Sequence, residues 1–517
     1  MLSSNLAELR KWFPSGTAEG EREILDKVFV YVREFEQIMA PPHGNPYLLI
    51  GKKGSGKSAV LDFAMKFLKY QETPAIFLRP SDIDTSAITD SDSISEINRK
   101  LSPILLSAIT AKLAECKDGF LTGDLATVYN EAVRSGDMSP SVVGRIGRAL
   151  SEIAKPLIKV DLNKVFPALT DVTRNELEHA VSRLLLGNRL YIFIDDSDQI
   201  ANPERVGHLN RVWGLILAVR SLTERIPEIK AIVTLRTEVW ERLRTDSGGN
   251  RDQTDHFTNL TVTLSNDSNH IRNIVERRLS FAEAACSPKE GIYQTFFEAD
   301  KARAPFSEDF RSWIDLILVR SRQRPRDAIQ LVSKLAESAT RRNATKISEV
   351  DLTSVMPAFS EDRAILFSQE VEKECPSALE ILRTFSQLNY HEGGFRLSAE
   401  EAKAHLASLP SRFSIQLFGR TIRPSVEADI FDLWKFLYHS GVLNARVSDS
   451  TERDGYRHVN PEVDPLLVSK SRWNEMQQDL WEVNPAYRDY LISRQREEAK
   501  KTGLPIRRPK SRRQGKQ

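Results

Sequence analysis

The residues most able to do chemistry form a glycine-rich stretch at positions 51–58, which reads Gly-Lys-Lys-Gly-Ser-Gly-Lys-Ser. This is the full GxxxxGK[ST] spacing of a phosphate-binding loop, and it lies between an apolar run and a helical pattern, as the motif requires. The loop amides surround phosphate oxygens, Lys57 reaches the β- and γ-phosphates, and the Ser58 hydroxyl binds Mg²⁺. The predicted nucleotide-binding residues are Gly51, Gly54, Ser55, Gly56, Lys57 and Ser58. They predict a site for ATP with Mg²⁺, although no base-reading motif separates ATP from GTP.

A second group of side chains, all acidic, follows the apolar run Tyr191 to Ile194. An apolar strand that ends in acids is typical of the metal-binding edge of such sites. We therefore predict that Asp195 binds Mg²⁺, often through water, and that Asp196 orients or deprotonates the attacking water. Solvated acids at a strand end are also common. The functional interpretation of Asp195 and Asp196 is favoured because the same chain has a phosphate-binding loop. Asp198 belongs to the same acidic turn, with a helix cap as its alternative role.

Two arginines are candidates for sensing the γ-phosphate. Arg236 follows the apolar run Ile229 to Leu235, where a parallel strand would reach the phosphate-binding edge, and its alternative is a surface arginine at a strand end. Arg326, in Arg-Pro-Arg-Asp at 324–327, could reach the phosphates from a lid, although proline is also typical of a simple helix start. The predicted catalytic residues are Lys57, Asp196, Arg236 and Arg326. Three more arginines could act on a neighbouring subunit, although a solvated charge is favoured for each: Arg242, Arg244 and Arg251.

Short apolar runs alternate with helical patterns around these residues, and this order predicts an α/β fold with a parallel sheet. The predicted strands are Pro46 to Ile50, Ala75 to Leu78, Leu190 to Ile194, Ile229 to Leu235 and Leu260 to Leu264. Helices are predicted between them at Ser58 to Tyr70 and Asn202 to Thr223. The acids and Arg236 are expected at the carboxyl edge of this sheet.

We expect the chain to divide into an N-terminal helical segment at 1–45, a P-loop domain at 46–268 with a helical insertion at 80–187, a helical lid at 269–356, a winged-helix-like domain at 357–495 and a basic disordered tail at 496–517. Apolar spacing predicts one amphipathic helix over Glu21 to Met39 and a helical stretch over Phe310 to Leu335. A helix at Val426 to His439, followed by paired runs at Gly441 to Val447 and Tyr456 to Asn460, suggests a winged helix-turn-helix.

The composition is that of a soluble protein with several domains. The chain has 517 residues, of which 28% are charged, and its apolar runs are far shorter than the ~18 residues of a membrane-spanning helix. Charges at Glu8, Arg10 and Lys11 argue against a secretory signal, which favours a cytoplasmic protein without a membrane partner. The three cysteines are far apart, so neither a disulfide framework nor a structural zinc site is expected.

Charge is distributed unevenly along the chain. Lys and Arg number 73 against 71 Asp and Glu, but the tail from Lys500 to Gln517 holds eight of the cations and no acid. The remainder therefore has 65 cations and 71 acids, a formal charge of −6. We expect the tail to bind nucleic acid without sequence preference and with strong salt dependence, or else to act only as a solvated, solubilising segment.

The predicted winged helix is poorly suited to reading DNA, because a recognition helix exposes basic or amide side chains to the major groove. The predicted helix instead exposes three acids and one basic side chain, which are Glu427, Asp429, Asp432 and Lys435. Its expected packing stripe consists of Ile430, Leu433, Trp434 and Leu437, and the later aromatic residues expected in the core are Trp473, Trp481, Tyr487 and Tyr490. Protein contact or autoinhibition is favoured over sequence-specific DNA binding.

Four stretches carry a resemblance to a known family: Ala18 to Glu21, GKKGSGKSA from Gly51, IDDSDQ from Ile194 and TLRTEVW from Thr234. Together they resemble bacterial P-loop ATPases related to the STAND, KAP and origin-recognition-like AAA+ ATPases, over roughly Ala18 to Leu335. The resemblance implies an AAA+ fold, an arginine after the sensor strand at Arg236, and a regulatory ATPase of a kind often encoded beside effectors in bacterial defence islands. Asp196 replaces the glutamate of typical AAA+ motors, so fast processive hydrolysis is not expected.

Two classes of function remain open. In the first, ATP binding or slow turnover switches the conformation or the homo-oligomeric assembly of a regulatory ATPase, which licenses a separate effector protein in antiviral defence. In the second, the chain is a DNA-binding AAA+ ATPase of the initiator or loader type. The sequence shows no nuclease or protease constellation, which favours an effector on another chain.

Overall fold

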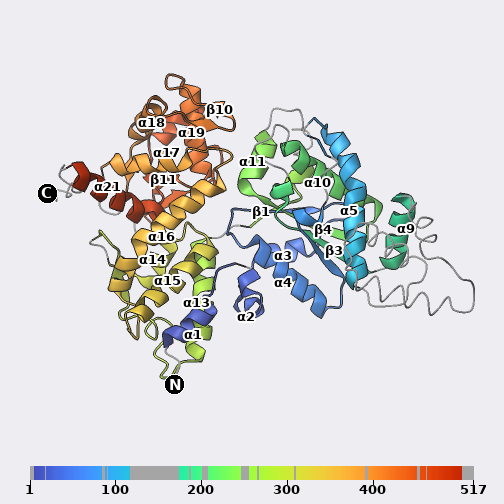
Figure 1. Ribbon diagram of the computed structural model, residues 1–517, viewed down its shortest axis with the longest axis horizontal. Coiled ribbons are helices and arrows are strands. Elements are labelled where there is room, and N and C mark those ends of the chain that lie inside the picture. Colours follow the sequence, from blue (N-terminus) through green and yellow to red (C-terminus); the bar gives the residue numbers. More distant parts are fainter. Residues whose placement is uncertain are drawn as a thin grey trace, which may run out of the picture. The chain divides into compact units, whose positions relative to one another are not determined.

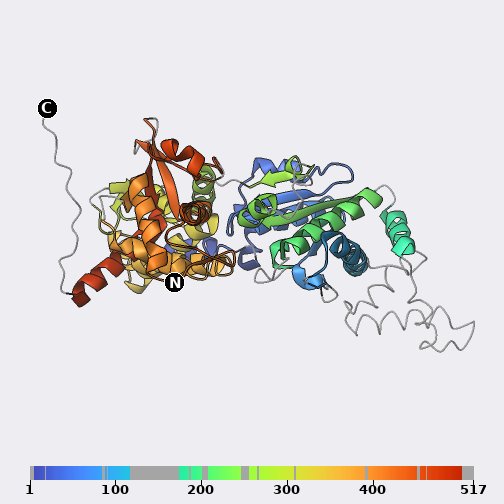
Figure 2. The ribbon, with the colours of Figure 1, turned by 90° about the horizontal axis from the view of Figure 1, so that it is seen from above.

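The computed structural model arranges the chain in two compact units (Figure 1, Figure 2), the first made of residues 1–30, 53–56 and 265–517 and the second of residues 31–52 and 57–264. The residues that the structure describes are 5–17, 19–83, 85, 88–89, 91–116, 174–185, 188–200, 208–245, 256–264, 267–307, 310–389, 394–450, 455–461 and 463–502. Within these ranges, the second unit has one buried apolar core and the first unit has two.

The second unit is built on a five-stranded parallel sheet with the order β2-β3-β4-β1-β5. Its strands are β1 (Tyr47–Gly51), β2 (Ala75–Leu78), β3 (Leu190–Ile194), β4 (Ile229–Arg236) and β5 (Thr261–Thr263). The predicted α/β fold with a parallel sheet is confirmed. β4 lies between β1 and β3, with Gly51 paired to Arg236 and Ile194 paired to Val233. The carboxyl ends of these three strands therefore share one edge.

Helices cover both faces of this sheet. They are α3 (Arg33–Ile38), α4 (Lys57–Tyr70), α5 (Ile94–Cys116), α9 (Arg174–Leu185), α10 (His208–Arg225) and α11 (Thr237–Thr245). Side chains alternate along a strand, so Leu48 and Ile50 join one core with α5 and α10, whereas Leu49 is buried on the opposite face. α5 and α10 pack against each other and lie side by side in Figure 1.

The single helix predicted over Glu21 to Met39 is wrong. The structure instead has the short helix α2 (Leu25–Val28), then extended backbone at Phe29, and then α3. The run at 28–32 reads Val-Phe-Val-Tyr-Val, and β-branched and aromatic side chains lose rotamer freedom in a helix and favour extended backbone. The boundary between the two units also falls inside this run, so the segment predicted at 1–45 is divided between them.

The first unit contains α1 (Asn5–Trp12), α13 (Ser268–Ala284), β6 (Lys301–Arg303), β7 (Phe310–Ser312), α14 (Trp313–Arg320), α15 (Pro325–Arg341) and α16 (Glu349–Glu370). α1 packs on α13 and α15, so the chain start shares a core with the predicted lid. The unbroken helical stretch predicted over Phe310 to Leu335 is wrong. Its first residues form the strand β7, and a turn with positive φ at Arg322 and Gln323 separates α14 from α15. The boundary predicted at residue 357 falls inside α16.

The C-terminal part of this unit has an antiparallel sheet with the order β12-β11-β13-β8. Its elements are α17 (Ala378–Thr384), β8 (Arg396–Leu397), α18 (Ala399–Ser408), β9 (Gln416–Leu417), β10 (Arg420–Thr421), α19 (Glu427–His439), β11 (Leu443–Ser448), β12 (Tyr456–Val459), α20 (Trp473–Met476), β13 (Leu480–Val483) and α21 (Arg488–Thr502). The predicted hairpin after the α19 helix is confirmed, since β11 and β12 pair antiparallel.

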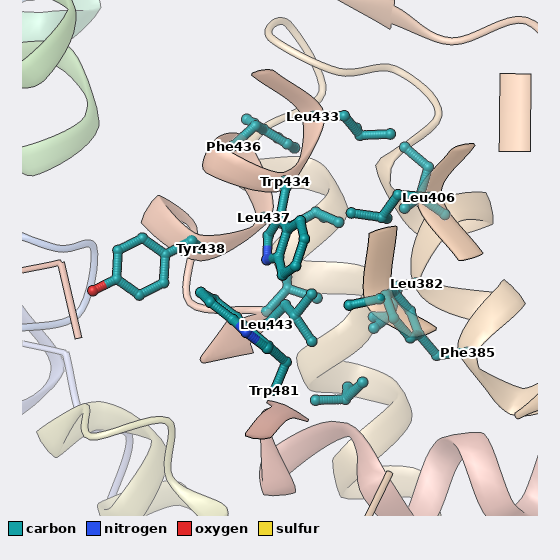
Figure 3. Close-up of a cluster of buried hydrophobic side chains, with 14 of the residues drawn as sticks. Leu382, Phe385, Leu406, Leu433, Trp434, Phe436, Leu437, Tyr438, Leu443 and Trp481 are labelled. Atoms are coloured by element: carbon teal, nitrogen blue, oxygen red, sulfur yellow. The ribbon is translucent and has the colours of Figure 1, made fainter. Parts of the chain in front are cut away.

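Aromatic side chains fill the core of this C-terminal part. Figure 3 shows Trp434 and Trp481 among leucines from several elements, with ring centroids 4.7 Å apart. The predicted packing stripe of α19 is buried, and so are Trp481, Tyr487 and Tyr490, while Trp473 packs against them partly buried. The prediction that these residues belong to the core is confirmed.

Two predicted regions lie mainly outside the described residues. Of the insertion predicted at 80–187, α5 and α9 are described and are helical, but residues 117–173 are not described. Of the tail predicted to be disordered at 496–517, residues 496–502 are described, and they continue the helix α21, so the prediction of disorder is wrong for this part. In the described parts of the chain, no helix combines the length and apolar character needed to span a membrane.

Candidate functional site

The glycine-rich loop joins β1 to α4, as a phosphate-binding motif requires. Gly54 and Gly56 have φ angles of 78° and 102°, a left-handed backbone that glycine adopts without the steric cost of a Cβ. α4 begins at Lys57, so its first N–H groups lie beside the loop. A glycine-rich turn and a helix start together present N–H groups to an anion, which makes this a suitable place for phosphate.

The Lys57 side chain is buried and is held by backbone carbonyls. Its Nζ donates to the carbonyl oxygens of Gly51 at 2.7 Å and Lys52 at 3.1 Å. Burial lowers the pKa of Lys57 from its ordinary value, while the charges of nearby carboxylates, Glu238 foremost, oppose this. An ammonium group with little water around it makes strong charge-assisted hydrogen bonds, so phosphate oxygens would be favourable acceptors for it.

A hydrogen bond joins Asp195, which follows β3, to Thr234 in the adjacent strand β4. The Thr234 hydroxyl donates to Asp195 Oδ1 at 2.6 Å, and both side chains are buried. Thr234 is also tied to the next two residues, because its hydroxyl accepts from the Asp196 N–H at 3.0 Å and its carbonyl accepts from the Ser197 hydroxyl. The carboxylate of Asp195 therefore has a fixed position at the sheet edge, and its charge acts on Lys57.

Asp196 has an unusual backbone for a residue other than glycine, with φ of 49°. Aspartate tolerates the left-handed region better than most residues, and the N–H bond to Thr234 holds it there. Partial desolvation, followed by the charges of Asp195 and Asp198, raises the pKa of Asp196. A carboxylate with a raised pKa at this edge is a suitable proton acceptor or water-orienting group.

Arg236 pairs with Asp198 in the structure. Its Nε lies 2.9 Å from Asp198 Oδ2, and Asp198 belongs to the turn η3 (Ser197–Ile200) that follows the two acids. The structure therefore brings Arg236 to the predicted edge, close enough for its charge to act on Asp196 and Lys57. Its role as a γ-phosphate sensor stays a prediction.

Thr234 is the residue that sequence reasoning did not single out for a role. The signal that could have found it is a hydroxyl inside the otherwise apolar run Ile229 to Leu235, in the strand before Arg236. A buried hydroxyl needs a hydrogen-bond partner, and a neighbouring strand that ends in acids supplies one. The contact between Thr234 and Asp195 depends on β4 lying beside β3, and this strand order cannot be read from the sequence.

Replacing Thr234 by valine is expected to slow hydrolysis by about tenfold or more while ATP still binds, because a hydrogen bond to a charged group contributes about 1.5–3 kcal/mol. Valine keeps the shape of threonine but leaves Asp195 without its donor. Turnover rate and the ATP dissociation constant should be measured separately. The matched control is Thr223→Val, since Thr223 is also buried but donates to the Arg220 carbonyl within α10. Equal turnover in both variants would contradict a role for Thr234.

Ser58 and Asp195 form a donor set suited to Mg²⁺. Both belong to the second unit, at the start of α4 and just after β3. Mg²⁺ prefers oxygen ligands and is usually held by one or two protein groups together with water and phosphates. Thr234 donates to only one carboxylate oxygen of Asp195. The residues present therefore fit the predicted ion.

Arg326 lies in the first turn of α15, in the unit that also contains residues 53–56. A Cβ at Gly54 would lie 3.6 Å from Arg326 Cβ and 3.7 Å from Arg324 Cδ, so the Gly54 backbone packs against the start of this helix. Arg324 Nη1 donates to both carboxylate oxygens of Glu370 at 2.8 Å. Arg326 pairs with no carboxylate among the described residues, and its Nε donates to the Gly16 carbonyl at 3.2 Å. Sensing by Arg326 stays a prediction.

The sequence also named Arg242, Arg244 and Arg251 as candidates. Arg244 forms a surface ion pair with Glu241, 3.3 Å away in α11. Arg242 lies in the same helix, half-buried. Arg251 lies outside the described residues. Their predicted action on a neighbouring subunit stays untested.

A family model, the FunZ-associated C-terminal helical domain, matches residues 269–366, which span α13 to the greater part of α16. No curated protein matches the chain. The matched range overlaps the region predicted as a helical lid.

Several solved structures are similar to the chain at low identity. The Aeropyrum pernix ORC2 protein in its ADPNP–ADP complexes is 11% identical with a TM-score of 0.40, covering 96% of this chain and 99% of that one. Cdc6p from Pyrobaculum aerophilum is 11% identical with a TM-score of 0.32, covering 91% and 98%. The Aeropyrum pernix ORC1 protein in complex with DNA is 14% identical with a TM-score of 0.31, covering 92% and 97%.

The predicted fold class is confirmed in its architecture: an α/β unit with a parallel sheet, then helices, then a C-terminal part with a β-hairpin. The strand order places β4 between the strand that precedes the phosphate-binding loop and the strand that precedes the acids. The chemistry of the site therefore depends on residues from three strands that are distant in sequence.

Proposed function

We propose that this protein is an ATP-binding and slowly hydrolysing ATPase that acts as a regulatory switch on a separate effector protein. The observation that carries the proposal is the meeting of Lys57, Asp195 and Thr234 at one edge of the parallel sheet. Each group has a distinct use in phosphoryl transfer, and each comes from a different strand or the loop after it.

The residues at this edge divide the work of binding and hydrolysis. Lys57 and the loop amides hold the phosphates, while Ser58 and Asp195 hold Mg²⁺. The bound ion would neutralise phosphate charge. Asp196, with its raised pKa, orients the attacking water and accepts its proton. Arg236 and Arg326 supply positive charge, the first from β4 and the second from α15.

Slow turnover is supported by the length of Asp196. An aspartate carboxylate reaches one methylene less far than the glutamate of typical AAA+ motors, and the left-handed backbone at this residue fixes its direction. A long-lived ATP state suits a switch better than a motor, because a partner can then read the bound state. The separate effector, the homo-oligomer and the role in antiviral defence follow from the sequence resemblance and are part of this proposal.

Changing Asp196 to asparagine is expected to leave ATP binding intact and to slow hydrolysis by about 100-fold or more, the usual contribution of general base catalysis. Asparagine keeps the size of aspartate but neither accepts a proton nor carries charge. Phosphate release and ATP affinity would be measured on the full chain, with Asp300→Asn on the surface as control. Hydrolysis at the wild-type rate would contradict the role of Asp196.

The same variant tests the switch. Sedimentation velocity with ATP, ADP or no nucleotide should show a larger species only with ATP, and the Asp196→Asn protein should hold that species for longer. An unchanged size under all three conditions would contradict nucleotide-dependent assembly, whatever the hydrolysis rate.

The structure of α19 weighs against the DNA-binding alternative. Eight of its thirteen residues are buried, including Asp429, whose predicted exposure is wrong, and Asp429 and Asp432 pair with Arg423 and Arg420. A helix that lies in a DNA groove must leave a face of basic or amide side chains exposed. Contact with a protein is therefore the better use of this helix.

Duplex DNA titration at two salt concentrations tests the alternative directly. An initiator should retain sequence-dependent binding at physiological salt, whereas the basic tail alone gives weak binding that falls steeply with salt. Sequence-dependent binding that Lys57→Ala abolishes would favour the initiator function over the switch.

A further inference from the structure

Two side chains of β4 hold the turn that follows β3, one at each end of the turn. At its start, the Thr234 hydroxyl donates to Asp195 and accepts from the Asp196 N–H. At its end, Arg236 Nε lies 2.9 Å from Asp198 Oδ2. Thr234 and Arg236 are two positions apart in the strand, so their side chains project from the same face of the sheet. All five residues belong to the second unit.

The residue between these two anchors, Asp196, has a backbone that needs support. Its φ of 49° lies in the left-handed region, which is costly for a residue with a Cβ. Its N–H bonds to Thr234, and its carbonyl oxygen accepts from the Gln199 N–H at 2.8 Å. The Asp196 side chain is exposed at the edge of the sheet, so the backbone on either side sets its direction.

The ion pair at the end of the turn is partly buried. The Asp198 side chain is 9% exposed and that of Arg236 is 23% exposed. Salt screens such a pair less than a surface pair, and removal of one partner leaves the other poorly compensated. Arg236 is itself fixed in the sheet, because its backbone pairs with that of Gly51 in β1. The pair therefore fixes the end of the turn to a rigid element.

From these contacts we infer that Asp198 is a positioning residue for Asp196. Thr234, Arg236 and Asp198 together form a clamp that holds the turn and directs the Asp196 carboxylate. The clamp sets the rate of hydrolysis and does not itself hold the nucleotide. The inference rests on the proposed function, since it requires Asp196 to orient the attacking water. It gives Asp198 a use in turnover where the sequence offered a helix cap.

The test compares turnover with ATP affinity in Asp198→Asn, measured on the full chain with ATP and Mg²⁺. Asparagine keeps the size of aspartate but cannot form the ion pair. Turnover should fall by about tenfold or more, because misplacing a catalytic group by about 1 Å costs on the order of 100-fold. The ATP dissociation constant should not rise, since Asp198 contributes no group to phosphate or to Mg²⁺.

The matched control is Glu178→Gln in the same unit. The Glu178 side chain is 12% exposed, and it pairs at 3.1 Å with Nε of Arg225, which ends α10. Because β4 begins at Ile229, shortly after this arginine, the control pair lies toward the opposite edge of the sheet from the turn. Glu178→Gln should lower the melting temperature as Asp198→Asn does, but it should keep wild-type turnover.

A double variant shows whether Asp198 acts through Asp196. Adding Asp198→Asn to Asp196→Asn should cause no further loss of turnover, because no carboxylate is left to position. If Asp198→Asn does not fold, Arg236 provides the same comparison. Arg236→Lys keeps a cation for Asp198 and should turn over faster than Arg236→Gln. This difference should disappear in the Asp196→Asn background, whereas a direct action of Arg236 on phosphate would preserve it.

Three outcomes would overturn the inference. They are wild-type turnover in Asp198→Asn, an equal loss of turnover in Glu178→Gln, and a further loss when Asp198→Asn is added to Asp196→Asn. In each of these cases, hydrolysis by the wild type leaves the proposed function standing. Failure of the wild type to hydrolyse ATP would instead refute the proposed function, and this inference with it.

Discussion

Lys57→Ala is expected to weaken ATP binding by at least about 100-fold and to abolish hydrolysis. The ammonium group is buried, burial lowers its pKa, and among the described residues it donates to the backbone carbonyls of Gly51 and Lys52. Phosphate oxygens carry more negative charge than these carbonyls, and each hydrogen bond between charged groups contributes about 1.5–3 kcal/mol. Alanine removes both the charge and the bonds, so the main electrostatic reason for phosphates to bind in this loop disappears.

Isothermal titration with ATP and Mg²⁺ measures the effect, and Lys69→Ala is its control because it removes an exposed charge from the last turn of the same helix. The fold of Lys57→Ala is checked by thermal unfolding without nucleotide. ATP should raise the melting temperature of the wild type and of Lys69→Ala, but not that of Lys57→Ala. Equal ATP affinity in all three proteins would refute the nucleotide site.

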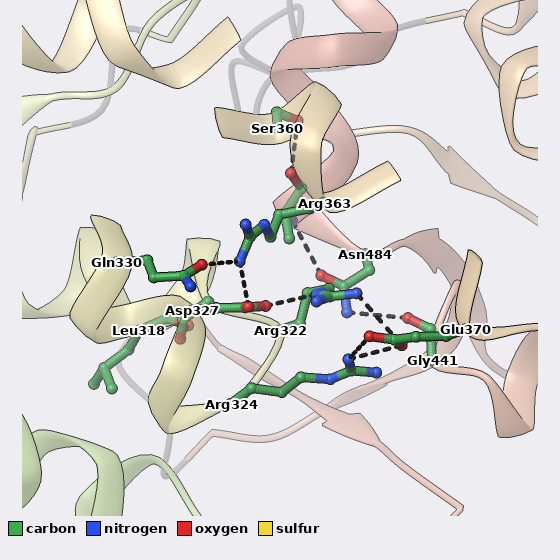
Figure 4. A network of polar contacts seen from close by, with 12 residues as sticks. Leu318, Arg322, Arg324, Asp327, Gln330, Ser360, Arg363, Glu370, Gly441 and Asn484 are labelled. Carbon is green, nitrogen blue, oxygen red and sulfur yellow. Dashed lines mark hydrogen bonds and ion pairs between the residues drawn. The ribbon is translucent and has the colours of Figure 1, made fainter. Parts of the chain in front are cut away.

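Asp327→Ala is expected to destabilise the first unit by about 3–5 kcal/mol, the usual cost of removing one partner from a buried ion pair. Figure 4 shows Asp327 between Arg322 and Arg363, with Glu370 bound to Arg324 beside them. The network contains three buried arginines and two carboxylates. Without Asp327, two of the guanidinium groups lose their closest carboxylate in a place that water does not reach.

The same network gives the effect a pH dependence. Burial alone would raise the pKa of Asp327, but the charges of Arg322 and Arg363 outweigh it and lower the pKa below the ordinary value. The stabilisation by this carboxylate is therefore complete above the unfolded pKa of about 3.9 and is lost as pH falls through the lower pKa of the folded state. The wild type and Asp327→Ala should accordingly differ most at neutral pH and converge in strong acid.

The control is Asp362→Ala on the neighbouring helix α16. Asp362 pairs with Lys334 at 3.0 Å, but both side chains are more than 40% exposed, so the expected loss is below about 1 kcal/mol. Urea unfolding of the full chain, followed by hydrogen exchange in α15 and α16, measures the loss in the first unit. Equal losses in the two variants at neutral pH would contradict a structural role for the buried network.

The elements that carry the proposed nucleotide site could be predicted from the sequence because their signals are local. The spacing of glycines with Lys57 and Ser58 defines the loop, and the apolar runs before it and before Asp195 define two strands. Parallel pairing followed from the alternation of strands and helices. The loop and each strand are inferred from residues that are close together in sequence, where backbone geometry alone relates spacing to structure.

The helices predicted from apolar spacing were wrong where the individual side chains favour another backbone conformation. The apolar spacing over Glu21 to Met39 fits a helix, yet Phe29 and its β-branched neighbours adopt extended backbone. At Phe310 to Leu335 the helical spacing continues across the turn before Pro325, where the chain instead changes direction. The periodicity of apolar residues indicates which residues are buried, but it does not indicate whether the helix between them is unbroken.

The partners of the functional side chains were decided by tertiary structure alone. Thr234 and Asp195 meet because β4 lies beside β3, and Arg236 is paired with Asp198 for the same reason. Gly16 meets Arg326 because α1 packs on α13 and α15. A sequence specifies which residues carry charge or hydrogen-bonding groups, but a hydrogen bond acts only within about 3 Å. Which groups come that close depends on the packing of the whole core, and no spacing along the chain encodes it.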